Sequence, residues 1–154
     1  MENISNLMGE IFDSPYIPIL FMAFLLIATY TDIKYRKIYN WLNVTFFILW
    51  FITIPIHGFS WMNIIGAILG FVLMLIPAMV KNQKMGGDIK AAGVIGLYMG
   101  VPGIFPFFLM TAATFIVYVL VMRLFGKQLQ LLPMGPFFLG AFLFMSSLNF
   151  TILQ

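Results

Sequence analysis

Long apolar runs separated by short charged segments constrain this chain more than any other feature. Hydrophobic residues make up 62% of the 154 positions and include 18 Phe and 12 Met, whereas Asp, Glu, Lys and Arg together make up 8%. Soluble globular domains contain about 25% charged residues, and one core of this size cannot bury so much apolar surface. The sequence therefore predicts an all-α integral membrane protein.

The number of apolar runs predicts the number of membrane spans. Crossing a bilayer takes about 20 apolar residues, so the chain has room for about six short spans and for no second domain. We expect a bundle of six transmembrane helices forming a single domain over residues 1–154. The expected spans are Pro15–Thr31, Trp41–His57, Trp61–Val80, Ala91–Val101, Phe105–Met122 and Pro133–Leu153, with Pro102, Gly103 and Pro106 separating the fourth span from the fifth.

The basic residues predict how the spans are oriented. All eight follow the first, third or fifth span: Lys34, Arg36, Lys37, Lys81, Lys84, Lys90, Arg123 and Lys127. Lys and Arg near span ends are kept on the cytoplasmic side, so both termini are expected outside. Asp32 and Asp88 then lie on the same, cytoplasmic side of the membrane.

The composition also excludes several kinds of chemistry. The chain has no cysteine, which excludes disulfides, thiolate zinc sites, iron–sulfur clusters and cysteine nucleophiles. Its single histidine, His57, is too few for a histidine metal site. The net charge of +3 is scattered between apolar runs and does not indicate nucleic-acid binding. We expect no metal, no cofactor and no nucleic-acid partner.

Asp32 and Asp88 need an explanation because ionisable groups at membrane depth are costly. The structural explanation pairs Asp32 with its basic neighbours and makes Asp88 the N-cap of a helix. Gly86 and Gly87 precede Asp88 and suit a backbone that passes close to something else, such as a docked peptide. The functional explanation is an aspartic protease, in which one ionised carboxylate activates water and a second, protonated one donates to the scissile carbonyl.

Three segments resemble a known family, the type IV prepilin peptidases, and among them the small tight-adherence-type enzymes. MGGDIKAAGVIGLYMG, Met85–Gly100, resembles the family's second-aspartate motif, in which glycines precede Asp and a small-residue helix follows. TDIKYRKIYNWLN, Thr31–Asn43, resembles the first-aspartate motif, which continues into an Ile-Pro-Asn-like triplet. LPMGPFFLGAF, Leu132–Phe142, resembles the Pro-Phe-Gly-Pro segment that opens the last helix.

The resemblance implies a membrane aspartic endopeptidase with Asp32 and Asp88 as catalytic residues. Such enzymes remove a short basic leader from pilin-like precursors at the cytoplasmic face of the prokaryotic inner membrane, in type IV pilus assembly and secretion. The expected partners are the precursor protein and membrane lipid. The methylating segment of the larger members, with its paired cysteines, is not expected here. Substrate-binding or site-shaping roles are implied for Gly86, Gly87, Lys90, Asn40, Pro133, Gly135 and Pro136.

Departures from the family pattern leave two other functions open. Met85 stands where the family has Gly, Tyr39 where it has Pro, and Met134 where it has Phe. One alternative is a small transporter or proton-coupled subunit that uses the two aspartates as ion sites. The other is an inactive relative that acts in pilus assembly. The GxxxG spacing of Gly66 and Gly70 indicates close helix contact, either within the bundle or in a homodimer.

Overall fold

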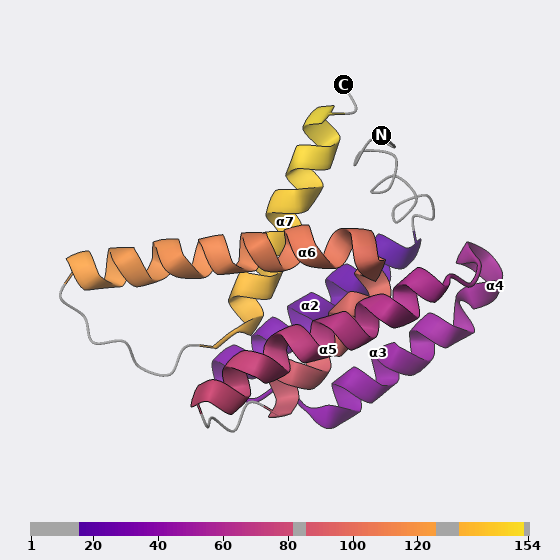
Figure 1. Ribbon diagram of the computed structural model, residues 1–154, viewed down its shortest axis with the longest axis horizontal. Helices are drawn as coiled ribbons and strands as arrows, with labels where there is room; N and C mark the ends of the chain where they lie inside the picture. Colours follow the sequence, from indigo (N-terminus) through magenta and orange to yellow (C-terminus); the bar gives the residue numbers. More distant parts are fainter. Residues whose placement is uncertain (1–15, 82–85, 126–132, 153–154) are drawn as a thin grey trace.

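The computed structural model describes residues 16–81, 86–125 and 133–152, and the regular structure in these ranges is helical. This confirms the predicted all-α class for the described part of the chain. Two of the helices, α2 and α6, are long and apolar enough to cross a membrane. The helices are α2 (Tyr16–Tyr35), α3 (Asn40–Ile52), α4 (Ile54–His57), α5 (Trp61–Lys81), α6 (Gly86–Leu124) and α7 (Gly135–Ile152), as Figure 1 shows.

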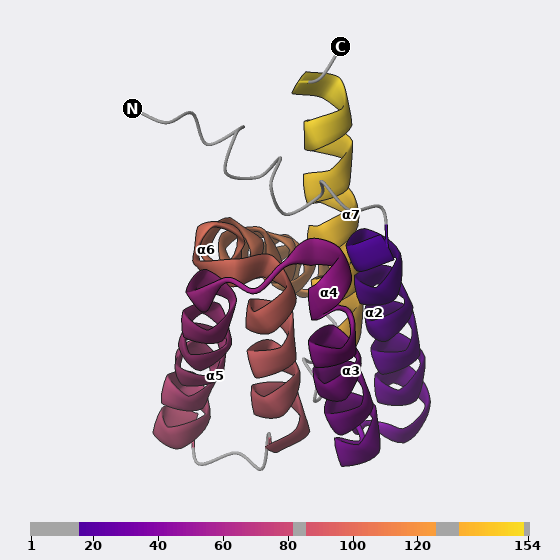
Figure 2. The ribbon, with the colours of Figure 1, turned by 90° about the vertical axis from the view of Figure 1, so that its right-hand side faces the viewer.

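The helices follow the predicted apolar runs, with differences at their ends. α2 continues past the predicted Thr31 to Tyr35, so Asp32 lies in its last turns instead of after it. The second run forms α3 and the short α4, which are separated at Thr53. α2, α3, α5 and the first half of α6 lie side by side (Figure 2). α2 begins and α7 ends at one end of this bundle, whereas α2 ends and α6 begins at the other.

The predicted break between the fourth and fifth spans occurs within α6, earlier than expected. Gly100 has φ 61° and ψ −176°, a combination that is nearly restricted to glycine, and the chain turns back there (Figure 1). Pro102 and Pro106 lie inside the second half of α6 instead of between two helices. Pro102 is tolerated there because the first N–H groups of a helix have no intrahelical partner.

Glycines bring α5 onto the first half of α6. A Cβ atom added at Gly66 would collide with the backbone of Gly96 and Gly100, and one added at Gly70 would collide with the carbonyl of Ala92. Such contacts require residues without side chains at the helix interface. The GxxxG spacing therefore serves a contact within the bundle.

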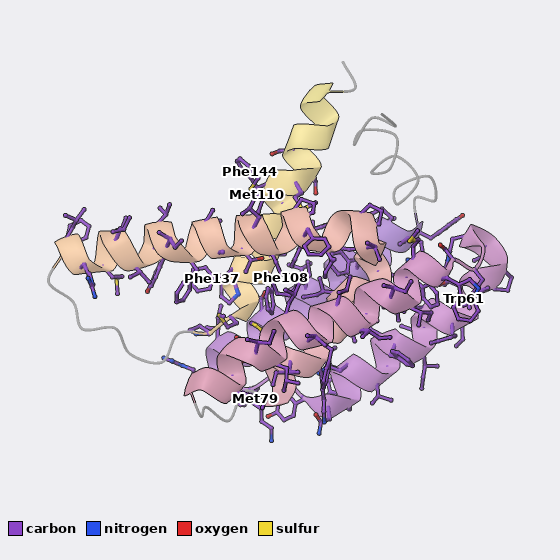
Figure 3. The ribbon with its side chains drawn as sticks, viewed as in Figure 1. Trp61, Met79, Phe108, Met110, Phe137 and Phe144 are labelled. Atoms are coloured by element: carbon purple, nitrogen blue, oxygen red, sulfur yellow. The ribbon has the colours of Figure 1, made fainter. Side chains whose placement is uncertain are left out.

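An aromatic cluster joins α2, both halves of α6 and α7. The Phe21 ring lies 5.6 Å from Tyr98, 6.2 Å from Phe107 and 5.0 Å from Phe142, measured between centroids. Aromatic pairs at these separations add to the stabilisation from burial. Other large apolar side chains face outward: Trp61 and Met79, at the two ends of α5, are 72% and 70% exposed (Figure 3). Such a surface suits lipid.

Candidate active site

Asp32 is buried where α2 ends and α7 begins. Its side chain is 4% exposed, and its Oδ2 accepts a hydrogen bond of 2.8 Å from the backbone N–H of Gly135. The start of a helix carries partial positive charge and is a favourable place for a carboxylate. The carboxylate thus reaches α7, whereas the basic neighbour Lys34 donates to the Tyr30 hydroxyl at 3.1 Å. Asp32 is therefore buried, and not at a helix end exposed to lipid headgroups as its structural explanation assumed.

The start of α7 is shaped to approach α2 closely. A Cβ atom at Gly135 would lie 2.8 Å from the Cα atom of Thr29, so only glycine fits without displacement. Pro136 is the second residue of α7, where the N–H that proline lacks would have no intrahelical partner. Pro133 lies just before the helix. Of the three residues predicted in this segment, Gly135 therefore contacts Asp32, and Pro133 and Pro136 flank it in the sequence.

Asp88 lies in the first turn of α6 and is half-buried. It is close enough to Asp32 for the two carboxylates to interact electrostatically. α6 begins at Gly86, so Asp88 is inside the helix and is not the N-cap that its structural explanation required. The two aspartates, far apart in the sequence, are thus brought to one end of the molecule.

Gly87 packs tightly, whereas its neighbour Gly86 does not. A Cβ atom at Gly87 would lie 2.5 Å from the carbonyl oxygen of Ile38, but one at Gly86 would meet nothing within 4 Å. The carbonyl oxygen of Gly87 accepts a hydrogen bond of 3.3 Å from Nδ2 of Asn43. The start of α6 is therefore fixed against the chain that leads into α3.

A second contact between α3 and α6 joins two residues that the resemblance singled out. Nζ of Lys90 donates a 3.1 Å hydrogen bond to Oδ1 of Asn40, at the exposed edge of the site. Asn43, in contrast, is a site residue that sequence reasoning missed. The available signal was a polar amide inside the otherwise apolar run of α3, one turn after Asn40; a buried polar group needs a partner.

The ends of α2, α3, α6 and α7 thus converge on the two carboxylates. In the described ranges no three His, Asp or Glu side chains come together in a way that could hold a metal ion. His57, in α4, packs against Trp50 of α3, and α4 lies at the opposite end of the bundle (Figure 2). The arrangement places two acidic groups within electrostatic range of each other and suits acid–base chemistry on a substrate at this end.

Comparison with known proteins assigns the chain to a family. The family model of the type IV leader peptidase family matches residues 19–121, which include Asp32 and Asp88 and end before α7. No curated protein and no solved structure matches the chain significantly. Because the match covers well over half of the sequence, the chain belongs to the type IV leader peptidase family, a family of proteases.

Proposed function

We propose that this protein is a multi-pass aspartic endopeptidase of a prokaryotic inner membrane that removes the short basic leader from pilin-like precursors. The observation that carries the proposal is that Asp32, from α2, and Asp88, from α6, lie at one end of the bundle, close enough to interact electrostatically. Family membership favours a peptidase over the alternative of a transporter.

The pair can hydrolyse a peptide bond by general acid–base catalysis. Asp32, hydrogen-bonded at the start of α7, is suited to carry the negative charge and to take a proton from water. The water oxygen then bonds to the scissile carbonyl carbon while Asp88 gives its proton to the carbonyl oxygen. When this tetrahedral intermediate collapses, the C–N bond breaks and the amine leaves with a proton from the pair.

The exposed edge of the site offers room for a peptide. Gly86 is exposed, and the space beside its Cα atom is open. An extended substrate can lie against this backbone, two residues from Asp88, because no side chain projects there. Lys90 and Asn40 border the same edge through their mutual hydrogen bond. We assign substrate binding to this edge and support of the site to Gly87, Pro133, Gly135 and Pro136.

The distribution of basic residues supports cleavage on the cytoplasmic side. Lys34 and Lys37 lie at or just after the end of α2, and Lys90 lies near the start of α6. Both of these helix ends are at the end of the bundle that holds the two aspartates. Basic residues mark the cytoplasmic face of membrane proteins. A leader that emerges on that side therefore has direct access to the pair.

Co-expression with a pilin-like precursor tests the proposal. We expect a precursor band to be replaced by a shorter one on a gel, with mass spectrometry placing the cut directly after the basic leader. A chain carrying Asp88→Asn, produced at the same level, is the control and should leave the precursor intact. Failure of the unaltered chain to shorten several pilin-like precursors would favour the inactive relative.

A further inference from the structure

Asn43 places a polar amide against the first turn of α6 from a helix that carries neither aspartate. It lies in the first turn of α3 and is 4% exposed. Its Nδ2 donates a hydrogen bond of 3.3 Å to the carbonyl oxygen of Gly87, the residue that precedes Asp88. This amide is therefore bonded to the turn that carries Asp88.

Stability alone does not account for an amide at this position. Oδ1 of Asn43 is buried and has no hydrogen-bond partner among the described residues. Leaving a buried acceptor without a partner costs free energy, and an apolar side chain of similar shape removes that cost. The carbonyl of Gly87 belongs to the first turn of α6, where helical carbonyls also accept from an N–H four residues later. It keeps that partner without Asn43.

The segment of residues 38–43, which includes the first turn of α3, contacts the start of α6 through three of its residues. The carbonyl of Ile38 packs on Gly87, Asn40 accepts from Lys90, and Asn43 donates to Gly87. The first is a steric contact, and the second lies at the exposed edge. Of the three contacts, the hydrogen bond from Asn43 is the one that is both directional and made by a buried side chain.

We propose that Asn43 is a positioning residue, which holds the first turn of α6 so that the Asp88 carboxyl faces Asp32 in the geometry needed for proton transfer. This inference rests on the proposed function, because the geometry matters for a reaction between the two groups. Small displacements of a catalytic group lower the rate of the chemical step more than they lower substrate affinity.

The chain offers a matched control. Nδ2 of Asn63, in α5, donates a 2.9 Å hydrogen bond to the carbonyl oxygen of Leu97 in α6. This is the same type of contact, made to the same helix from a neighbouring one, but about two and a half helical turns away from Asp88. Asn63→Leu therefore removes an equivalent bond without touching the turn that carries the aspartate.

The first test compares leader cleavage by Asn43→Leu and Asn63→Leu in membranes at matched protein level. For Asn43→Leu we expect kcat to fall about tenfold, KM to stay within about twofold and thermal stability in detergent to be equal or higher. Asn63→Leu should keep the parental kcat. Equal losses of kcat in both variants, or a loss in Asn43→Leu that accompanies a lower melting temperature, would overturn the proposal.

The second test needs no cleavage activity. The parent chain has no cysteine, so Asp88→Cys creates a single reporter whose alkylation by a water-soluble maleimide follows the opening of this turn. Adding Asn43→Leu should raise the labelling rate about threefold or more, whereas adding Asn63→Leu should not. Unchanged labelling with Asn43→Leu would refute the positioning role. If the parent cleaves no precursor while labelling still separates the two variants, the proposed function fails and the positioning of residue 88 stands.

Discussion

At the scale of single residues, the sequence identifies the acidic groups but not their partners. Asp32 and Asp88 could be identified as candidate site residues because a carboxylate in or beside an apolar helix is energetically costly and is therefore often functional. The partner of Asp32, the N–H of Gly135, is 103 positions away. No local pattern contains such a contact, because it depends on how α7 packs against α2.

Gly87 yields a prediction at this scale. We expect Gly87→Ala to lower both the melting temperature in detergent and the rate of cleavage, because its Cβ would lie 2.5 Å from the carbonyl oxygen of Ile38. Overpacking of this kind costs about 1–3 kcal/mol. Gly86→Ala is the matched control for folding, since nothing lies within 4 Å of its Cβ position. A melting temperature of Gly87→Ala equal to that of Gly86→Ala would contradict the close packing.

At the scale of elements, the apolar runs predicted the helices well because hydrophobic length is a property of the local sequence. The break in α6 was predicted near the correct place but assigned to Pro102, Gly103 and Pro106, none of which makes it. Pro102 and Pro106 were expected to separate two helices, yet both lie within the second half of α6. Gly100 makes the break, since it alone in that helix has a backbone conformation outside the helical region.

Gly100→Ala tests this account of the break. An alanine at φ 61° and ψ −176° is strained by about 1–3 kcal/mol, so we expect a lower melting temperature. Gly140→Ala in α7 is the control: nothing lies within 4 Å of its Cβ position, and alanine favours a helix over glycine by about 1 kcal/mol. It should melt at the parental temperature or above. Equal melting of the two variants would mean that the break does not depend on glycine.

At the scale of the whole molecule, the bundle brings the ends of four helices to one place and leaves an apolar exterior. Two helices qualify as membrane spans by length and composition. The six-span topology and the outward termini remain predictions from the basic residues. The distribution of charge along the chain predicts the side of the membrane, but it contains no information about which helices are neighbours.

Cysteine labelling in intact cells tests the topology. Single cysteines at Asn6 and at Gly58 should react with a membrane-impermeant maleimide, and one at Gln83 should react only after the cells are opened. The physical reason is that all eight basic residues follow spans that end on the cytoplasmic side. Labelling of position 83 from outside would reverse the orientation and exclude cytoplasmic cleavage.

The central claim is that Asp32 and Asp88 act as one acid–base pair, and its most direct test is leader cleavage by Asp32→Asn and Asp88→Asn measured side by side. Asparagine has nearly the same shape as aspartate, and at position 32 it keeps a side-chain oxygen that can accept the N–H of Gly135. Both variants should therefore insert and melt like the parent. We expect each to lose cleavage completely, because neither residue alone can both take and give the proton. Cleavage at the parental rate by either variant would contradict the account.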